Sequence, residues 1–466
     1  MQEKVSLFPR QKETLRKALD YIEGKERRPG VIVAPTAYGK SFVISAIANE
    51  VGSPVLVLQP SKELLEQNYE KLLLLGGEAA IFSASLNSKE VDKLTYATLG
   101  SIKDKADIFK KLGVKIVLID ECDAGYPPDK GKRFRKFIDK LAPDKVIGLT
   151  ATPFRMKNTF DVNTRESVSR LVMLNRMRPM YFKHFIDVIQ IQEMTEQNRW
   201  CKLHYTKYTF NQESLRLNST GSEFTDSSMK KAIQEQGINN SIYSRVVDLL
   251  EDPNERVLVF CDSVETAEKL ASCIPDTEAL SDKTTNKERE RIVREFRENK
   301  IRAVFNYGVL SVGFDYQELN RIIWGRPTNS LRLYYQVNGR GVRIHPDKEV
   351  CYIEDFCGNV DRFGRVEDIT IENFPGYGWG VFSGDILLTD HPMGYPRITK
   401  QKLSQKDDTP VEKLWFGKNK GKRLDELSLH NLKWYSDWID NLDNPSNKLR
   451  GLKLSIESIL ENNNLL

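Results

Sequence analysis

Short apolar runs alternate with helix-spaced apolar residues along the first third of the chain. Apolar runs bounded by polar residues are typical of strands buried on both faces of a sheet. Such runs occur at residues 31–34, 55–59, 79–83, 93–98, 114–119 and 146–149. Between them, apolar residues recur every three or four positions, which predicts helices; the first such segment carries Leu15, Ala18, Leu19 and Ile22. Strands that alternate with helices predict an open parallel α/β sheet.

The same alternation returns after residue 200. It predicts strands at residues 203–210, 257–260 and 302–306 and helices at residues 242–250, 265–274 and 287–299. Residues 155–200 are predicted to be helical and irregular, and residues 361–395, which are rich in Gly, Pro and aromatic residues, show little periodicity. We therefore expect an α/β protein with two parallel-sheet domains in tandem and a small, mainly helical C-terminal module, at residues 1–195, 196–395 and 396–466.

Composition narrows the class of protein. The 466 residues include 70 Lys and Arg against 65 Asp and Glu, a net charge of +5, so any affinity for nucleic acid must come from local basic patches. Residues 397–423 form such a patch, with nine Lys and Arg against three Asp and Glu. The six cysteines form no CxxC pair, so we expect reduced thiols and no structural zinc. No apolar run approaches the roughly 18–20 residues of a membrane span and no secretory signal opens the chain, so we expect a cytoplasmic protein, in the host cytoplasm if a phage encodes it.

The strand predicted at residues 31–34 is followed by a loop with the spacing of a P-loop. In VIVAPTAYGKS, Ala34 stands where the first glycine is usual, and Gly39, Lys40 and Ser41 follow. Backbone N–H groups at the start of the next helix would surround phosphate oxygens. The Lys40 ammonium would reach the β- and γ-phosphates, and the Ser41 hydroxyl would bind Mg²⁺. This stretch predicts a site for ATP and Mg²⁺.

Two acidic residues follow the strand predicted at residues 114–119. ATP hydrolysis needs one carboxylate near Mg²⁺ and a second that orients or deprotonates the attacking water. Asp120 suits the first role and Glu121 the second. Two acids at a strand end are often only a solvated turn, but the upstream P-loop favours the catalytic interpretation.

Two arginines lie far downstream, in QVNGRGVR (336–343). Arg340 and Arg343 are three residues apart, so both can face one partner from a helix. Guanidinium groups stabilise charge on a transferring γ-phosphoryl group. The pair is therefore predicted to reach the ATP bound by the P-loop.

Taken in order, these motifs make the chain resemble the superfamily-2 helicases of the DEAD/DEAH type over nearly all of its first 360 residues. APTAYGKS (34–41) is similar to motif I, QPSKELLEQ (59–67) to motif Ia, DECD (120–123) to motif II, TATP (150–153) to motif III, VLVFCDS (257–263) to motif IV, NYGVLSVGFD (306–315) to motif V and QVNGRGVR to motif VI. Within the superfamily, TATPFR (150–155) and YIEDF (352–356) most resemble RadD-type proteins and phage branch-migration helicases such as UvsW. The chain departs from the common pattern at Ala37, where many members have glycine, and at Phe8 and Arg10 beside Gln11; unlike RadD, it has no cysteine-rich module after motif VI.

The resemblance implies two RecA-like domains and assigns roles by position. It implies ATP contacts from Gln11, Pro35, Thr36, Ala37, Tyr38, Gly39, Lys40, Ser41, Gly313 and Asp315, with Gln336 joining Arg340 and Arg343 in catalysis. It implies that Asp123, Thr150 and Thr152 couple hydrolysis to movement and that Ser61, Lys62 and Thr98 contact the nucleic-acid backbone. WFGKNKGKR (415–423) resembles a stretch of small modules attached to some nucleases and helicases, so Lys418, Lys420 and Lys422 are also predicted to bind nucleic acid.

The function we expect is that of a monomeric, ATP-dependent DNA helicase or translocase that remodels forks or Holliday-type junctions in replication, recombination or repair. Two alternatives stay within the same class of motor: a duplex translocase that does not separate strands, and an RNA helicase. A third is an ATP-gated clamp with negligible turnover, against which the complete set of Lys40, Glu121, Arg340 and Arg343 argues.

Overall fold

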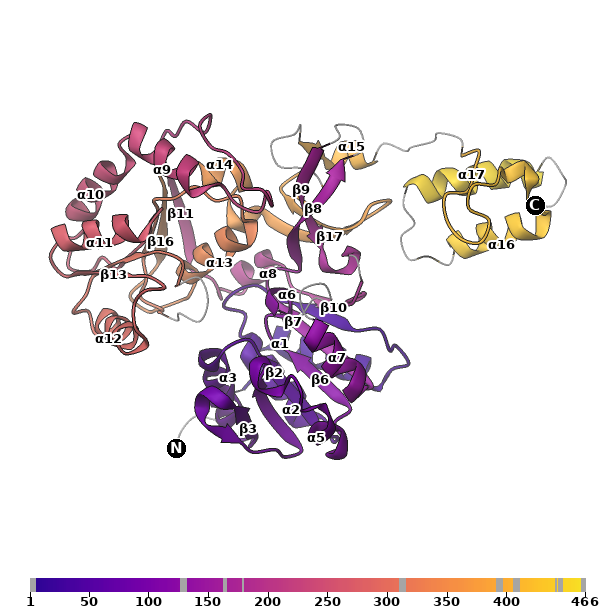
Figure 1. Cartoon of the computed structure of the whole chain (residues 1–466), viewed down its shortest axis with the longest axis horizontal. Helices are drawn as coiled ribbons and strands as arrows, with labels where there is room; N and C mark the ends of the chain where they lie inside the picture. The colour runs from indigo at the N-terminus through magenta and orange to yellow at the C-terminus, as the bar shows by residue number, and fades with distance from the viewer. Residues whose placement is uncertain are drawn as a thin grey trace. The chain divides into compact units, whose positions relative to one another are not determined.

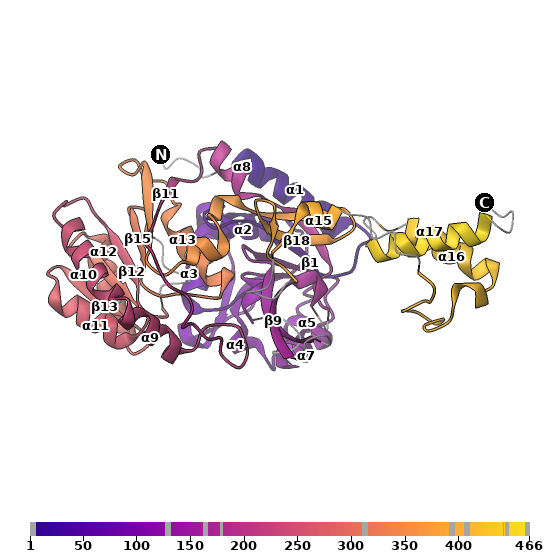
Figure 2. The same ribbon diagram turned by 90° about the horizontal axis from the view of Figure 1, so that it is seen from above.

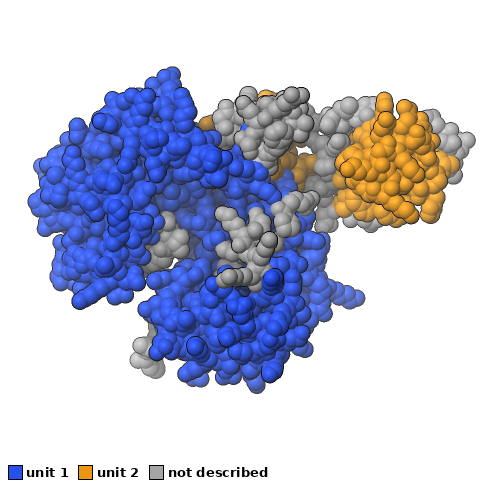
Figure 3. Space-filling view, viewed as in Figure 1, with its two compact units in different colours: residues 1–367 blue, residues 368–466 orange. Residues whose placement is uncertain are grey.

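The computed structural model describes residues 6–125, 132–161, 166–177, 180–309, 316–390, 397–404, 411–440, 442 and 447–461. The chain divides into two compact units, Met1–Glu367 and Asp368–Leu466 (Figure 3). The first unit contains two separate parallel sheets flanked by helices (Figure 1). The predicted tandem α/β architecture with a helical C-terminal part is confirmed, while the domain boundaries proposed at residues 195 and 395 stay predictions.

The first sheet has eight strands in the order β10-β1-β7-β6-β2-β5-β3-β4. Their bounds are His184–Val188, Gly30–Val33, Lys145–Thr150, Ile116–Ile119, Val55–Gln59, Leu94–Thr98, Ala80–Ser83 and Ser88–Lys89. All neighbours are parallel except β3 and β4. The central strands β1, β2, β6 and β7 are buried along their whole length, which explains their continuous apolar runs.

Helices cover both faces of this sheet. The helices are α1 (Pro9–Glu23), α2 (Lys40–Glu50), α3 (Lys62–Leu74), α4 (Leu99–Ile102), α5 (Ala106–Lys111), α6 (Cys122–Gly125), α7 (Lys132–Leu141) and α8 (Ile191–Glu196). Helix α2 packs against both α1 and α3. Helices α5 and α7 pack together through the rings of Phe109 and Phe137, and Figure 2 shows them on the side of the sheet opposite α1 and α2.

The second sheet has six parallel strands in the order β11-β16-β15-β12-β14-β13. Their bounds are Lys202–Lys207, Val350–Asp355, Arg321–Trp324, Val257–Phe260, Ala303–Asn306 and Thr277–Leu280. Its helices are α9 (Asp226–Glu235), α10 (Ile238–Leu249), α11 (Val264–Cys273), α12 (Asn286–Arg297), α13 (Leu331–Gly341) and α14 (Asn359–Phe363). Side chains alternate between the two faces of a strand: in β15, Ile323 packs into the core shared with α10 and α11, whereas the Trp324 ring packs against Tyr334 of α13.

The second unit contains an antiparallel sheet and a helical tail. The sheet runs β17 (Ile369–Phe374), β18 (Gly378–Ser383), β19 (Ile386–Leu387) and β20 (Ile398–Thr399), followed by α15 (Lys400–Ser404). The tail pairs α16 (Leu429–Asp440) with α17 (Asn447–Glu461) around a core of its own that includes Leu432, Ile439 and Ile456.

Two stretches differ from the prediction. Residues 155–200 were expected to be helical and irregular, but they contain an antiparallel strand pair, β8 (Phe154–Asp161) and β9 (Glu166–Met173), and the edge strand β10. Residues 361–395, which lack clear periodicity, contribute β17, β18 and β19. In both places the local pattern of apolar residues is too weak to predict a strand, and hydrogen bonds to neighbouring strands stabilise the extended conformation. Across the residues that the structure describes, no helix is both long enough and apolar enough to cross a bilayer.

Candidate active site

The phosphate loop joins β1 to α2 and leaves the start of α2 uncapped by any described side chain. Gly39 has a φ of 84°, a conformation that favours glycine, and a Cβ there would lie 2.6 Å from Gln11 Nε2 and displace that side chain. Ala37 adopts the same left-handed region, with φ 60°, at a cost of roughly 1–2 kcal/mol for a residue with a side chain. The loop therefore keeps the backbone shape of a glycine at this position, and such strain is concentrated at functional sites.

The acidic pair lies at the end of β6, opposite the loop. Glu121 Oε1 lies 3.3 Å from Lys40 Nζ, and the second oxygen, Oε2, is buried without a hydrogen-bond partner among the described residues. Asp120 accepts hydrogen bonds from Asn68 Nδ2 at 2.8 Å and from the Glu121 backbone at 3.0 Å. Burial, and secondarily the Glu121 charge, raise the pKa of Asp120 to about 6. A buried carboxylate beside an unsatisfied one fits a divalent cation, whose charge would favour the ionised forms.

Helix α1 and the residue before it, Phe8, lie against the phosphate loop. Gln11 Nε2 donates to the Tyr38 carbonyl at 2.8 Å, and Gln11 Oε1 accepts from the Phe8 backbone at 3.2 Å. The Tyr38 and Phe8 rings meet edge to face with centroids 5.5 Å apart. Gln11 thus lies at the site, but both ends of its amide are already bonded within the protein. Its predicted role in reading adenine would require it to exchange one of these bonds.

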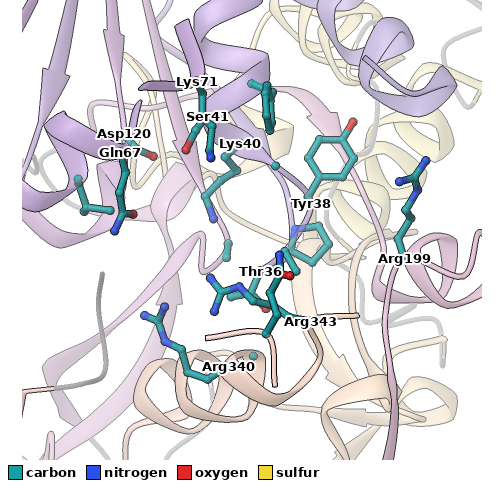
Figure 4. Close-up of a pocket in the computed structure, with 18 of the residues that line it drawn as sticks. Thr36, Tyr38, Lys40, Ser41, Gln67, Lys71, Asp120, Arg199, Arg340 and Arg343 are labelled. Atoms are coloured by element: carbon teal, nitrogen blue, oxygen red, sulfur yellow. The ribbon is translucent and has the colours of Figure 1, made fainter. Parts of the chain in front are cut away.

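Residues from the second sheet line the same cavity. The cavity has a volume of about 890 Å³, and its lining includes Gln11, Pro35, Thr36, Ala37, Tyr38, Gly39, Lys40, Ser41, Asp120, Glu121, Gln336, Arg340 and Arg343. Figure 4 shows Arg340 and Arg343 on the side of the cavity opposite Lys40 and Ser41. A Cβ on Gly339 of α13 would lie 2.3 Å from Thr36 Oγ1, so glycine lets α13 approach the loop closely. The fold therefore assembles predicted residues that are about 300 positions apart in the sequence.

The three residues predicted to couple hydrolysis to movement form one buried cluster. Asp123 accepts hydrogen bonds from Thr150 Oγ1 at 2.7 Å and Thr152 Oγ1 at 2.9 Å. It also accepts one from Arg332 Nε at 2.5 Å, and Arg332 belongs to α13. This ion pair links the acidic motif of the first sheet directly to the helix that carries Gln336 and Arg340.

Sequence reasoning missed Arg332, Trp200 and Asn68. Arg332, Gln336 and Arg340 are spaced by four, which places them on one face of a helix and could have revealed the first of them. Trp200 Nε1 donates to the Thr36 carbonyl at 3.0 Å from the segment just before β11, and Arg199 lies 4.6 Å from the Phe8 ring centroid. No local pattern marks Trp200 or Asn68, because their partners are distant in the sequence.

The residues predicted to contact nucleic acid lie in both units of the chain. Ser61 caps α3 by accepting from the Leu64 backbone at 3.3 Å, and Thr98 Oγ1 lies 2.8 Å from Ser101 Oγ. Thr98 is the last residue of β5, and Ser61 and Lys62 follow the end of its neighbour β2. Lys418, Lys420 and Lys422 are exposed residues of the second unit. Gly313 and Asp315 lie outside the described residues.

Two parts of the chain match known families. Residues 4–155 match the family described as type III restriction enzyme, res subunit, and residues 241–345 match the helicase conserved C-terminal domain. The first match covers every strand of the first sheet except β10, and the second covers four of the six strands of the second sheet. Together the matches include the loop, the acidic pair and the arginines.

Several relatives are similar along most of the chain. A Schizosaccharomyces pombe protein named as the mitochondrial ATP-dependent helicase irc3 is 25% identical over 96% of this chain and 69% of its own length. A 51.5 kDa protein of a Lactococcus phage is 24% identical over 70% of this chain and 65% of its own length. The DNA 3'-5' translocase XPB2 of Sulfurisphaera tokodaii is 24% identical over 71% of this chain and 78% of its own length.

Solved structures share the fold at low sequence identity. The type ISP restriction-modification enzyme LlaBIII bound to DNA matches with a TM-score of 0.54 and 14% identity, over 76% of this chain and 28% of that one. A fragment of an HsdR subunit of a type I restriction enzyme from Vibrio vulnificus also matches with a TM-score of 0.54, at 16% identity, over 74% of this chain and 63% of that one. The chain thus spans less than two thirds of either structure that it resembles.

Proposed function

Because the chain belongs to the superfamily-2 helicases, a class of ATP-hydrolysing enzymes, we propose that it is an ATP-driven motor that moves on DNA and remodels branched substrates. One observation carries the proposal. The P-loop of the first sheet and the arginines at the end of α13 line a single cavity, so a change at the γ-phosphate would alter the contact between the two domains.

The proposed chemistry assigns a task to each side of the cavity. Lys40 and the open start of α2 hold the phosphates, and Glu121 orients the attacking water. Arg340 and Arg343 stabilise charge that develops on the transferring phosphoryl group. Ser41 and Asp120 would hold Mg²⁺, which when bound supplies charge neutralisation at the phosphates. Hydrolysis then weakens the contact of the arginines with the first domain, and the Asp123–Arg332 pair transmits the change to α13.

DNA is the proposed track because relatives named for helicase or DNA translocase activity share both domains. Three residues at the ends of the adjacent strands β2 and β5 are proposed to contact phosphates of one DNA strand without reading sequence: Ser61, Lys62 and Thr98. The preference for forks or four-way junctions rests on the resemblance to branch-migration helicases. A duplex translocase without strand separation is the second candidate, which the similarity to a protein named as a 3'-5' translocase favours.

The test measures ATP hydrolysis with single-stranded, duplex, forked and four-way DNA and with RNA of matched length. We expect the largest stimulation with branched DNA and its loss in Glu121→Gln, which should still bind ATP. Parallel strand-unwinding and triplex-displacement assays separate the two candidates, because only the first requires strand separation. Stimulation by RNA alone, or none by any polymer, would overturn the proposal.

A further inference from the structure

The C-terminal tail exposes a large aromatic side chain that its core does not use. Trp434 of α16 is 55% exposed, the highest fraction among the large apolar side chains of the described residues. Its ring stacks on that of Trp438, one helical turn later, at a centroid distance of 6.3 Å and an angle of 5°. Trp438 is half-buried against the tail core, whereas the outer face of Trp434 is in solvent. An indole in this position offers a flat apolar surface held in place by its neighbour.

A basic loop lies against the same helix. Residues 413–423, KLWFGKNKGKR, contain five Lys and Arg and no acidic residue. Phe416 anchors this loop by packing on Tyr435 at 5.8 Å and on Trp438 at 5.5 Å. Two backbone hydrogen bonds close the loop: the Leu414 N–H donates to the Lys422 carbonyl, and the Gly421 N–H donates to the Leu414 carbonyl. Gly417 and Gly421 adopt left-handed conformations that turn the chain. The loop that carries the lysines is therefore anchored on Tyr435 and Trp438, the two residues whose rings also contact Trp434.

The charges of this loop are available to a ligand. Lys418, Lys420 and Lys422 are exposed, and none makes an ion pair within the part of the tail that the structure describes. Arg423, by contrast, is paired with Asp425 at 3.0 Å. Three lysines on a loop anchored to the helix of an exposed indole combine attraction for phosphates with a stacking surface. A duplex offers phosphates to the lysines but keeps its base faces stacked on one another. Only unpaired nucleotides can therefore contact both the lysines and the indole.

We propose that Trp434 with Lys418, Lys420 and Lys422 forms a binding site for unpaired nucleotides, in which a base stacks on the indole and flanking phosphates contact the lysines. The proposal deepens the proposed function and rests on it for the identity of the polymer as DNA. Forks and junctions contain or transiently expose unpaired bases. The site would thus hold one single-stranded arm while the motor acts on another.

The test uses the full chain without nucleotide and two labelled 12-residue probes: oligo-dT and a chain of abasic residues with the same phosphates. The wild type should bind oligo-dT about tenfold more tightly, because one base–aromatic contact is worth about that factor. Trp434→Ala should remove most of this preference, and Trp434→Phe should keep most of it. Leu454→Ala is the matched control, since Leu454 is 53% exposed in the same tail and should leave both affinities unchanged.

Equal binding of the two probes by the wild type, an unchanged preference in Trp434→Ala, or an equal loss in Leu454→Ala would overturn the proposal. Replacing the three lysines by Gln should weaken both probes and reduce the salt dependence of binding. DNA-stimulated ATP hydrolysis is measured on the same proteins. If DNA does not stimulate hydrolysis by the wild type but the wild type still prefers oligo-dT, the motor is rejected and the tail site is not. If DNA stimulates hydrolysis but the preference for oligo-dT is absent, the tail site alone is rejected.

Discussion

The two sheets of the first unit each have a central strand that leads into a helix, and the two junctions differ in how the helix begins. At the β1–α2 junction the cap is Gly39, no described side chain bonds the first turn, and Lys40 opens the helix. At the β12–α11 junction the Ser263 side chain accepts from the Thr266 backbone at 3.1 Å, and Glu265 lies in the first turn. The N–H groups at a helix start must find partners. The first turn of α2 receives no hydrogen bond from a described side chain, which is consistent with its proposed role in binding phosphate, whereas Ser263 caps the first turn of α11.

Electrostatics reinforces the difference. The positive end of a helix dipole attracts anions. At α11 the protein supplies its own anion, because a hydrogen bond to the Glu265 backbone N–H and the nearby Lys230 lower the pKa of the Glu265 carboxyl. At α2 the adjacent charge is the Lys40 ammonium, and its acidic partner, Glu121 at 3.3 Å, comes from the end of β6 and not from the helix itself. A shared sheet architecture therefore does not make a phosphate site; the residues at the cap decide it.

Lys40→Ala should show the largest effect, because it removes the charge that we propose binds phosphate at the first junction. We expect ATP hydrolysis to fall by at least about 10³-fold, which corresponds to roughly 4 kcal/mol. Turnover under saturating ATP and DNA is the measurement, with thermal unfolding as the control for folding. Turnover within tenfold of the wild type would contradict the role given to Lys40.

Asp187→Asn tests the support of the first junction. Asp187 of β10 accepts from Arg10 at 2.7 Å and Thr14 at 2.8 Å, and the Arg10 carbonyl accepts from the Tyr38 hydroxyl of the loop. Breaking a buried ion pair costs about 3–5 kcal/mol, so we expect a loss near 3 kcal/mol in unfolding free energy at pH 7. The matched control is Asp361→Asn, which breaks an exposed pair with Lys207 and should cost under about 1 kcal/mol.

Comparing the wild type with Asp187→Asn at several pH values gives a second test of this ion pair. Burial alone would raise the pKa of Asp187, but hydrogen bonds from Arg10, Lys17 and Thr14 outweigh burial and lower the pKa. Its contribution is therefore complete above the unfolded pKa of about 3.9 and is lost as pH falls through the lower folded value. The difference in stability between wild type and Asp187→Asn should be constant from pH 5 to 8 and shrink below about pH 4. A difference that grows on acidification would contradict this ion pair.

Arg332→Ala tests whether the first junction acts through contact with the second domain. The variant leaves the cavity lining intact but removes the bond from α13 to Asp123. We expect DNA-stimulated turnover to fall about tenfold, or roughly 1.4 kcal/mol, with ATP affinity unchanged. A double-mutant cycle with Asp123→Asn should show strong non-additivity. Additive effects would mean that the pair does not couple the domains.

Ser263→Ala should show the smallest effect, and it tests the β12–α11 junction. Loss of a serine cap costs about 1 kcal/mol of stability, which chemical denaturation can measure. ATP hydrolysis should stay within about twofold of the wild type, because this helix start is not assigned to phosphate. A large loss of hydrolysis would show that the second junction also serves the reaction.

The sequence predicted the strands that lie between two layers of helices, such as β2 and β12, because burial on both faces demands continuous apolar residues. It failed for β8, β9 and β17, because these strands of small antiparallel sheets mix polar and apolar residues and lack a continuous apolar run. Their partners, not their own residues, set their conformation.

The sequence by itself determined the local chemistry of the site: Lys40 and Ser41 after a strand, two acids after another, and two arginines one turn apart. Such motifs can be recognised in the sequence because each consists of residues within a few positions of one another. Only the tertiary structure decided which distant residues complete the site. Arg332 meets Asp123 across 209 positions, Trp200 meets Thr36 across 164, and Asn68 meets Asp120 across 52. The spacing of Arg332, Gln336 and Arg340 marks one face of a helix but not the partner of that face. Packing decides the partner, between the two sheets for Arg332 and between α3 and the end of β6 for Asn68.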